Sequence, residues 1–549
     1  MLQPKTLFDR AWKRGARDFF LSLSLANLAY YPIWDQLVNL PDAYFGKEPP
    51  PSIAFAAAWF SVLLLTLVTT SARLLPAIAG SGRLRDSGRW ITPAVWLLPL
   101  SFFISSLSQQ LGASSWLASG AQVALILVAL ALSIRWPARV LHAAEIAALI
   151  FIPFVVVTAG QSLWWLSGGD RSESPARPPL AAMQPMPPMP VQRVVWIVMD
   201  EFDYRLAFDA RPAGIALPAL DRLREEAFFA TQARPPAWRT LLSIPAMING
   251  ERVVAADPIS RNELGIYFET GEEAVSWSKT PNLFTRARKR GLNVSVVGFY
   301  HPYCELFSKL ISECTVADFF TRWDRRNFSE TLGDQWAEWI TRIPVLAAPW
   351  NALSLPHWGS PRKVTFLKET LLELHETLMR GVRQTLDRQD LQLQLIHLAV
   401  PHPPGIYDRR ENKISLAADA NYIDNLELAD RVLGQIRADA EKAGIWEDTT
   451  WILTSDHWWK SEFWKTQPGW TEEEESLATG ETDQRVPFFV KIAGATDTVE
   501  YPAPLEIVII PRLIEALWDG SIKSHQELSR WLLLHPSREE KLGSGAARR

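Results

Sequence analysis

Long hydrophobic runs dominate the first third of the chain, whereas shorter runs alternate with charged positions through the remainder. Five of the long runs have the length of about 20 residues that is needed to cross a bilayer. We therefore predict five membrane-spanning helices, at residues 19–38, 52–71, 90–108, 116–134 and 146–166. The first run contains Asn27 and Asp35 and also suits an interfacial segment, but its Tyr30, Tyr31 and Trp34 are typical of an aromatic belt near one membrane face.

Basic residues in the connecting loops predict the orientation of these helices, because cytoplasmic loops of membrane proteins are enriched in Lys and Arg. They occur before the first run, between the second and third, and between the fourth and fifth, at Lys5, Arg10, Lys13, Arg14, Arg17, Arg73, Arg83, Arg85, Arg89, Arg135 and Arg139. The other loops hold only Lys47. An odd number of spans that begins in the cytoplasm places everything after residue 166 on the outer side of the membrane.

A segment rich in glycine and proline follows the last hydrophobic run, at residues 167–190. Proline fixes the backbone angle φ and removes a hydrogen-bond donor, so the segment favours extended chain over helix. We expect three parts: a transmembrane domain at 1–166, a linker at 167–190, and an extracytoplasmic domain at 191–549.

The third part alternates strand-like and helix-like patterns. Apolar runs of the kind found in buried strands lie at residues 194–199, 293–299, 391–398, 450–455 and 486–492. Helical patterns lie at residues 218–227, 240–249, 281–290, 363–386 and 421–443. This alternation predicts an α/β fold with a mostly parallel sheet between helices. Sites in such sheets form beyond the carboxyl ends of the strands, where Asp200, His402 and Asp456 fall.

Charge and cysteine content narrow the possible functions. The formal net charge is only -4 and no long stripe of Lys and Arg is present, which argues against nucleic acid as a partner. The only two cysteines, Cys304 and Cys314, fall in the expected outer domain, where an oxidising compartment permits a disulfide. The alternative is a pair of reduced thiols.

Acidic residues and a histidine directly follow two of the predicted strands. Asp200 and Glu201 come after residues 194–199, and Asp456 and His457 come after residues 450–455. Carboxylate and imidazole groups from separate strand ends form a mixed ligand set that suits a divalent metal ion. The alternatives are helix caps or solvated acids.

Two further residues have the local setting of catalytic groups. His402 lies between prolines, which present its ring from a rigid loop as a proton donor requires. Thr240 lies where a loop becomes a helix, so its hydroxyl gains from the helix N-terminus and from a nearby metal. Thr240 as a simple helix cap is the alternative.

Taken in order, these residues resemble the alkaline phosphatase and sulfatase superfamily, and within it the membrane-anchored phosphoethanolamine and phosphoglycerol transferases, including lipoteichoic acid synthase. The resemblance covers roughly residues 191–520 and includes the five preceding spans. Its motifs are Asp200-Glu201 after a strand, Thr240-x-x-Ser243-x-Pro245, Pro401-His402-x-Pro404, Asn421-Tyr422, Thr454-Ser455-Asp456-His457 and Arg485-Val486-Pro487-Phe488.

The resemblance implies roles for individual residues. Thr240 would be both covalent nucleophile and metal ligand, Asp200 or Glu201 with Asp456 and His457 would complete the ligand set, and His402 would bind substrate or donate a proton. The chain departs from the family at Trp458, where glycine is common, and in having no histidine in the twenty residues after His457. Lys460 or Arg485 would take the role of the missing substrate contact, and Arg239 is a further candidate for substrate binding.

The resemblance also implies a reaction. Sulfatases use a formylglycine made from Cys or Ser, which Thr240 cannot supply, so phosphoryl transfer is favoured. We expect a transferase of the bacterial inner membrane, with its catalytic domain on the periplasmic side and one zinc or manganese ion. It would move a phosphoethanolamine or phosphoglycerol group from a membrane phospholipid to an envelope glycan or lipid, through phosphothreonine. A hydrolase and an inactive envelope assembly protein are the alternatives.

Tryptophan-rich stretches at residues 336–350 and 458–470 allow two interpretations. They either reach lipid head groups and build the acceptor cleft, or they pack as ordinary core and interface aromatics.

Overall fold

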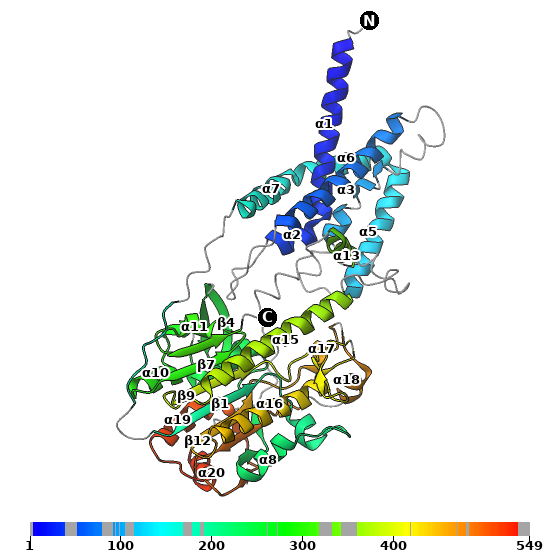
Figure 1. Ribbon diagram of the computed structural model, residues 1–549. Coiled ribbons are helices and arrows are strands. Elements are labelled where there is room, and N and C mark those ends of the chain that lie inside the picture. The colour runs from blue at the N-terminus through cyan, green and yellow to red at the C-terminus, as the bar shows by residue number, and fades with distance from the viewer. Residues whose placement is uncertain are drawn as a thin grey trace. The chain divides into compact units, whose positions relative to one another are not determined.

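The computed structural model describes residues 4–38, 52–78, 92–104 except 94 and 98, 115–167, 178–186, 191–317 except 261 and 272, 332–341, and 360–535 except 418, 468 and 479–482. The chain divides into two compact units, and Figure 1 shows their helices and strands. Unit 1 comprises Met1–Pro41, Lys47–Glu173 and Asp324–Arg362, and unit 2 comprises Asp42–Gly46, Ser174–Trp323 and Lys363–Arg549. The described residues 332–341 therefore belong to the same unit as the N-terminal helices, although the sequence pattern places them inside the expected domain 191–549.

Unit 1 is helical. Its labelled helices are α1 (Pro4–Ala29), α2 (Tyr31–Val38), α3 (Ser52–Ile78), α5 (Ser115–Arg135), α6 (Pro137–Ile150), α7 (Ile152–Leu166) and α13 (Leu332–Thr341). Among the residues that the structure describes, two helical stretches are long and apolar enough to cross a membrane, Ile53–Arg73 in α3 and Pro137–Trp164 in α6 and α7. Of the five predicted spans, those at residues 52–71 and 146–166 therefore correspond to helical stretches of this kind.

The other three predicted spans differ from the expectation in identifiable ways. Residues 19–38 are divided at Tyr30, because a turn separates α1 from α2 and Pro32 lies in the first turn of α2. Residues 116–134 lie in α5, whose qualifying apolar part is the shorter Gln122–Arg135. Residues 90–108 fall partly outside the described residues, and the helix there is Val95–Ile104.

Polar contacts fix the packing of the helices within unit 1. The Ser24 hydroxyl donates to the carbonyl of Ala148 at 2.7 Å, and the Asn27 amide donates to the Thr158 hydroxyl at 3.1 Å. Nearer the start of α1 and the end of α3, Glu145 accepts ion pairs from Arg17 at 2.9 Å and from Arg73 at 2.8 Å. The order of these contacts along the helices shows that α1 and the α6–α7 pair run in the same direction and that α3 runs in the opposite one.

Helix α13 packs against the end of α1 and the beginning of α3. Gln335 is fully buried there, and both ends of its side-chain amide have partners. Its oxygen accepts from the Tyr30 hydroxyl at 3.0 Å, and its nitrogen donates to the carbonyl of Ala54 at 2.8 Å. The indole N–H groups of Trp336 and Trp339 donate to Ser61 and to the carbonyl of Ala29. The described part of the 336–350 stretch thus packs inside unit 1, and residues 342–350 lie outside the described residues.

Unit 2 is built on an eight-stranded sheet whose order is β14-β2-β13-β12-β1-β9-β7-β8. These strands are β1 (Arg193–Met199), β2 (Phe228–Ala230), β7 (Val294–Gly298), β8 (Glu313–Val316), β9 (Leu393–Leu398), β12 (Thr449–Ser455), β13 (Phe488–Lys491) and β14 (Val499–Tyr501). The neighbours from β12 to β8 are parallel, and β13 pairs antiparallel with β12 and β2. The predicted α/β fold with a mostly parallel sheet is confirmed.

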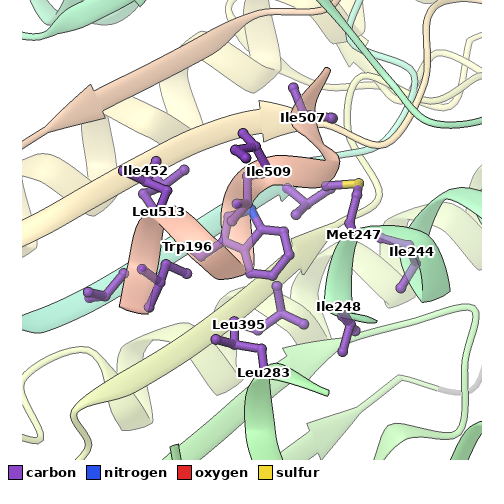
Figure 2. Packing of buried hydrophobic residues seen from close by; sticks show 14 of the residues in the cluster. Trp196, Ile244, Met247, Ile248, Leu283, Leu395, Ile452, Ile507, Ile509 and Leu513 are labelled. Atoms are coloured by element: carbon purple, nitrogen blue, oxygen red, sulfur yellow. The ribbon is translucent and has the colours of Figure 1, made fainter. Parts of the chain in front are cut away.

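Helices cover both faces of this sheet (Figure 1). On one face, Trp196 of β1 packs among aliphatic side chains that include Ile452, Leu395, Ile248 and Leu513 (Figure 2). The helices there are α9 (Thr240–Asn249), α10 (Leu283–Lys289), α19 (Ile510–Trp518) and α20 (His525–Leu534). The opposite face is covered by α8 (Pro218–Glu226), α15 (Ser360–Thr385) and α16 (Tyr422–Lys442).

Smaller elements complete unit 2. They are β3 (Ala233–Arg234), β4 (Val253–Ser260), β5 (Glu263–Phe268), β6 (Val275–Ser276), β10 (Tyr407–Asp408), β11 (Lys413–Ile414), β15 (Leu505–Glu506), α11 (Tyr303–Leu306), α17 (Ser461–Trp464), α18 (Glu472–Leu477), a π-helical turn η1 (Arg205–Asp209), and 3-10 turns η2 (Trp277–Lys279) and η3 (Ile507–Ile509). A disulfide joins Cys304 of α11 to Cys314 of β8, with the two Cα atoms 5.7 Å apart, so the predicted bridge is confirmed.

Candidate metal centre and active site

The register of the central strands brings the predicted ligands to one edge of the sheet. Met199 pairs with Ser455 on one side and with Leu398 on the other, so the three strands end at the same level. Asp200 and Asp456 each follow their strand immediately, and His457 comes next. All three side chains are buried, and each offers a ligand atom to one cluster.

The distances within this cluster are those of a metal coordination shell. Nε2 of His457 lies 3.4 Å from Oδ1 of Asp200, 3.4 Å from Oδ2 of Asp456, and 3.3 Å from Oγ1 of Thr240. Ligand atoms around a tetrahedral ion with bonds of about 2.0–2.1 Å are about 3.3–3.4 Å apart. All three separations are measured from Nε2 of His457, and they are compatible with four ligand atoms around one ion.

Other atoms of His457 and Asp456 have partners of their own, which leaves Nε2 of His457 and Oδ2 of Asp456 for the cluster. Nδ1 of His457 lies 3.0 Å from the carbonyl of Trp458, which favours the tautomer with a lone pair on Nε2. Oδ1 of Asp456 accepts from the backbone N–H of His457 at 2.9 Å, whereas Oδ2 of Asp456 and Oδ1 of Asp200 are buried without a hydrogen-bond donor.

The electrostatics of the two aspartates also call for a cation. Burial, followed by the nearby negative charges of Asp456 and Glu201, raises the pKa of Asp200 well above its usual range. Two buried carboxylates in such proximity cannot both ionise without a compensating charge. The donor set, the unpaired oxygens and the charge therefore all fit a divalent ion, and Asp200, Asp456, His457 and Thr240 are the residues that would hold it.

Thr240 is the first residue of α9 and is not its cap. Arg239 occupies the N-cap position in an extended conformation, and its carbonyl accepts from the N–H groups of Leu242 and Ser243. The Thr240 hydroxyl is buried at the positive end of the helix dipole, which stabilises negative charge on its oxygen. This placement suits a nucleophile.

Ser243 explains the Thr-x-x-Ser spacing. One turn after Thr240, its hydroxyl donates to the main-chain carbonyl of Asp456 at 2.5 Å. The bond joins the helix that carries Thr240 to the segment that carries Asp456 and His457.

Glu201 lies beside the cluster, but its carboxylate has other partners. Its backbone φ of 60° is in the left-handed region, where residues other than glycine are uncommon, so the chain turns sharply after Asp200. One carboxylate oxygen lies 3.0 Å from Nζ of Lys460, and the other accepts from the indole N–H of Trp464 at 2.7 Å. Burial disfavours the ionised form, but Lys460 and then His402 lower the pKa of Glu201 below its usual range.

Hydroxyl groups from two other elements hold this turn in place. The Tyr422 hydroxyl donates to the carbonyl of Glu201 at 2.7 Å and accepts from the N–H of Asp203 at 3.1 Å. The Ser455 hydroxyl accepts from the N–H of Phe202 at 2.8 Å and lies 2.6 Å from the carbonyl of Met199. Tyr422 of the Asn-Tyr motif and Ser455 of the Thr-Ser-Asp-His motif thus hold the backbone on both sides of Asp200.

His402 lies on the same flank as Glu201 and Lys460. Its Nδ1 lies 2.5 Å from the carbonyl of Pro403, and its ring packs edge-on against Trp464. The Asn425 amide donates to the carbonyl of His402 at 2.9 Å and fixes the loop. Burial lowers the pKa of His402, although Glu201 opposes that effect.

The three predicted substrate contacts have different surroundings. Lys460 is partly exposed beside Glu201, and Arg239 directly precedes Thr240 with its guanidinium above the Trp238 ring. Arg485 is held by Asp209 at 2.5 Å and by Asp483 at 2.6 Å, and its guanidinium also packs on the Tyr204 ring. The structure therefore gives Arg485 structural partners and brings Lys460 and Arg239 beside the candidate centre.

Two aromatic residues near the centre do not stand out in the sequence. Tyr300 has a positive φ of 70°, and its hydroxyl pKa is raised by burial and by the charge of Asp200. It follows β7, so the strand-end rule that identifies Asp200 applies to it as well. His301 lies next to it with Nε2 3.3 Å from the carbonyl of Thr240, and burial lowers its pKa to about 3, so the ring is neutral.

The chain matches a known protein family. The family model named Sulfatase matches residues 192–507, whereas no curated protein sequence matches the chain. Two of the similar solved structures are the lipoteichoic acid synthase LtaP from Listeria monocytogenes and the phosphonate monoester hydrolase SpPMH from Silicibacter pomeroyi.

The first shares 15% identity over 60% of this chain and 72% of its own, with a TM-score of 0.37. The second shares 14% identity over 60% of this chain and 74% of its own, with a TM-score of 0.39. Since the family model covers more than half of the chain, the protein belongs to the sulfatase family, within the alkaline phosphatase and sulfatase superfamily.

Proposed function

We propose that this protein is a membrane-bound, metal-dependent transferase that uses Thr240 as its nucleophile. It takes a phosphoethanolamine or phosphoglycerol group from a phospholipid and passes it to a hydroxyl of an envelope glycan or lipid. The observation that supports this most directly is the 3.3 Å between Oγ1 of Thr240 and Nε2 of His457, which makes a hydroxyl the fourth member of the ligand cluster. A threonine at this place favours phosphoryl over sulfuryl chemistry, because it cannot form the formylglycine of sulfatases.

In the first half-reaction, the Thr240 oxygen forms a bond to phosphorus and the bond from phosphorus to the diacylglycerol oxygen breaks. The proton leaves the Thr240 hydroxyl, and a proton is delivered to the departing diacylglycerol oxygen. When bound, a divalent ion supplies Lewis acidity that stabilises the phosphoryl charge and lowers the pKa of the hydroxyl.

In the second half-reaction, the acceptor hydroxyl attacks phosphothreonine, loses its proton and restores the Thr240 hydroxyl. His402 is the candidate for these proton transfers, because it lies beside Glu201 and Lys460 at the edge of the cluster. Its lowered pKa makes the resting ring neutral, so it is ready to accept the proton of the acceptor hydroxyl.

Zinc is the metal that we propose. The separations of 3.3 and 3.4 Å from Nε2 of His457 to the other three ligand atoms are compatible with tetrahedral coordination, which zinc prefers. A larger, octahedral site of oxygen ligands would be expected for manganese or magnesium.

We further propose that unit 1 anchors the protein in the inner membrane of a bacterium and that unit 2 lies on the periplasmic side. Two qualifying helices, the apolar composition of the other three runs, and the basic loops support this topology. The packing of α13 is consistent with it. This helix, which the sequence places after the last span, contacts the end of α1 and the start of α3, which the topology assigns to the outer side.

The test is intact-mass analysis of the full-length protein after incubation with mixed bacterial phospholipids and zinc or manganese. Wild type should gain the mass of the transferred head-group phosphate, Thr240→Ala should gain nothing, and Thr240→Ser, which keeps a hydroxyl, should gain the same mass. Release of diacylglycerol that requires an added acceptor distinguishes the transferase from a hydrolase. No added mass and no diacylglycerol with either metal would leave the inactive assembly protein as the better explanation.

A further inference from the structure

A cavity in unit 2 lies along the line of contact between α15 and α16. Its volume is about 550 Å³, which is within the range of small-molecule sites. From α15 it is lined by residues on one helical face, from Leu372 to Arg383, and from α16 by Arg431, Val432 and Gln435. Ile414 of β11 closes one side.

This cavity is separate from the metal centre. Arg431 is nine positions after Tyr422, whose hydroxyl touches the backbone of Glu201. At 1.5 Å per residue, that is about 13 Å along the helix axis. The lining includes none of the candidate ligands or the proposed nucleophile.

The lining has an excess of positive charge. Arg380, Arg383 and Arg431 contribute three guanidinium groups, and Glu376 is the one carboxylate among the described lining residues. Other arginines of unit 2, such as Arg211 and Arg437, form ion pairs with carboxylates. Within the part of the chain that the structure describes, no carboxylate lies at ion-pair distance from the three arginines of the cavity.

The local contacts leave these arginines available to a ligand. Arg380 donates to the Thr377 hydroxyl at 2.9 Å, and Arg431 packs its guanidinium over the Tyr407 ring. A cation above a ring keeps the N–H groups at the guanidinium edge free for an anion. His375 is close enough to Arg383 to be affected by its charge, and burial together with Arg383 lowers its pKa to about 4, so it adds a neutral hydrogen-bonding group.

The same cavity has apolar walls. Leu372, Met379 and Val432 line it beside the arginines. A free inorganic anion would use only the charged part of such a surface, whereas a ligand that joins an anion to a carbon-rich group would use both. Guanidinium groups bind phosphate through paired hydrogen bonds.

We propose that the α15–α16 cavity is a second binding site, which takes a phosphate group attached to an apolar moiety. The ligand that meets both requirements is the head-group end of an anionic phospholipid, and a soluble phosphorylated polyol, which carries the phosphate without the apolar part, is the comparison. Both ligands carry the phosphate, but only the phospholipid has an apolar part that can contact the apolar walls of the cavity.

The proposal is tested by calorimetric titration of the detergent-solubilised full-length chain with two probes, dioctanoyl phosphatidylglycerol and glycerol 3-phosphate. All chains carry Thr240→Ala, so that the metal centre consumes no probe. Replacing Arg380, Arg383 and Arg431 by alanine should weaken binding of the preferred probe by roughly tenfold or more, since each bond to a charged group contributes substantially. Binding should also weaken with added salt.

Two control chains separate the site from general charge effects. One replaces Arg410, Arg512 and Arg530 by alanine, which are exposed as the three cavity arginines are, and so removes the same charge elsewhere. The other places lysine at the three cavity positions, which keeps the charge but loses the paired hydrogen bonds, and it should bind at an intermediate level.

Hydrogen exchange gives a second readout that locates the ligand. Residues 372–383 and 431–435 should exchange more slowly when the preferred probe is bound. Equal binding by the cavity variant and the surface control, or protection elsewhere only, would overturn the proposal. Zinc content of the chain that keeps Thr240 reports separately on the metal centre, so failure of one site is distinguishable from failure of the other.

Discussion

The hydroxyl of Ser243 donates to the main-chain carbonyl of Asp456 at 2.5 Å, and this bond ties α9, which carries Thr240, to the segment that carries Asp456 and His457. Both partners are buried, so the bond is not exchanged with water. The distance between Thr240 and His457 therefore depends on a residue that is neither a ligand nor a nucleophile.

Replacing Ser243 by alanine should reduce metal affinity or turnover by about 10–100-fold, as removal of residues that support metal ligands commonly does. Stability should fall by only about 1–2 kcal/mol, because one buried hydrogen bond is lost. Ser295→Ala is the control, because Ser295 is equally buried on β7 and its hydroxyl has no partner among the described residues. Isothermal titration with zinc and steady-state kinetics measure the two effects. Equal behaviour of both variants would contradict the positioning role.

Asp200 and Glu201 differ in their surroundings, which predicts different effects of the same loss of charge. Asp200→Asn should lower the zinc content of the purified protein well below one ion per chain, because Oδ1 of Asp200 faces the cluster. Glu201→Gln should retain the ion, because Lys460 and Trp464 bind that carboxylate. Elemental analysis by mass spectrometry decides between them, and the reverse result would make Glu201 the first ligand.

The location of the site follows from the sequence, whereas the division of roles within it does not. Apolar strands that end in acidic residues predict one sheet edge with Asp200, Asp456 and His457, and the register confirms that edge. The choice between Asp200 and Glu201 depends on a left-handed turn at Glu201. No residue-type pattern predicts that turn, because glycine is the residue expected there.

Long-range partners account for the other differences. Residues 332–341 have the amphipathic pattern of a helix, but the pattern does not say which surface the helix covers. Their partners, Tyr30 and Ala54, are about three hundred positions away in sequence. Hydropathy alone likewise counted five runs, although a turn at Tyr30 interrupts the first of them.

Lys460 compensates the buried charge of Glu201, so its loss should be costly. Lys460→Met should destabilise unit 2 by roughly 3–5 kcal/mol, since it leaves a buried carboxylate without its partner. Adding Glu201→Gln should recover most of that loss. The matched control is Lys465→Met, which breaks an exposed pair with Glu475 and should change stability little. Chemical unfolding of the wild type, Lys460→Met, Glu201→Gln and the double variant gives the coupling energy between Lys460 and Glu201. Additive effects of the two substitutions would show that the pair does not interact.

Asp430 predicts a pH dependence of stability that is independent of the metal centre. Its carboxylate accepts from the N–H groups of Ala219 and Leu220 at the start of α8, at 3.2 and 2.7 Å. Burial outweighs these bonds and raises the pKa of Asp430 to about 6. Because the folded pKa is above that of the unfolded chain, the protonated form stabilises the fold at low pH, and this contribution is lost as pH rises through 6.

Asp430→Asn removes that titration. The stability of the wild type relative to Asp430→Asn should therefore fall by up to roughly 3 kcal/mol between about pH 4 and pH 7, given about 1.4 kcal/mol per pKa unit. Below pH 4 both chains carry a neutral side chain at this position, so the difference between them should be constant there. Unfolding by urea at a series of pH values measures the two curves. If the curves stay parallel from pH 4 to pH 7, the Asp430 carboxyl ionises in the folded protein as it does in the unfolded chain, and the burial argument for this helix start is wrong.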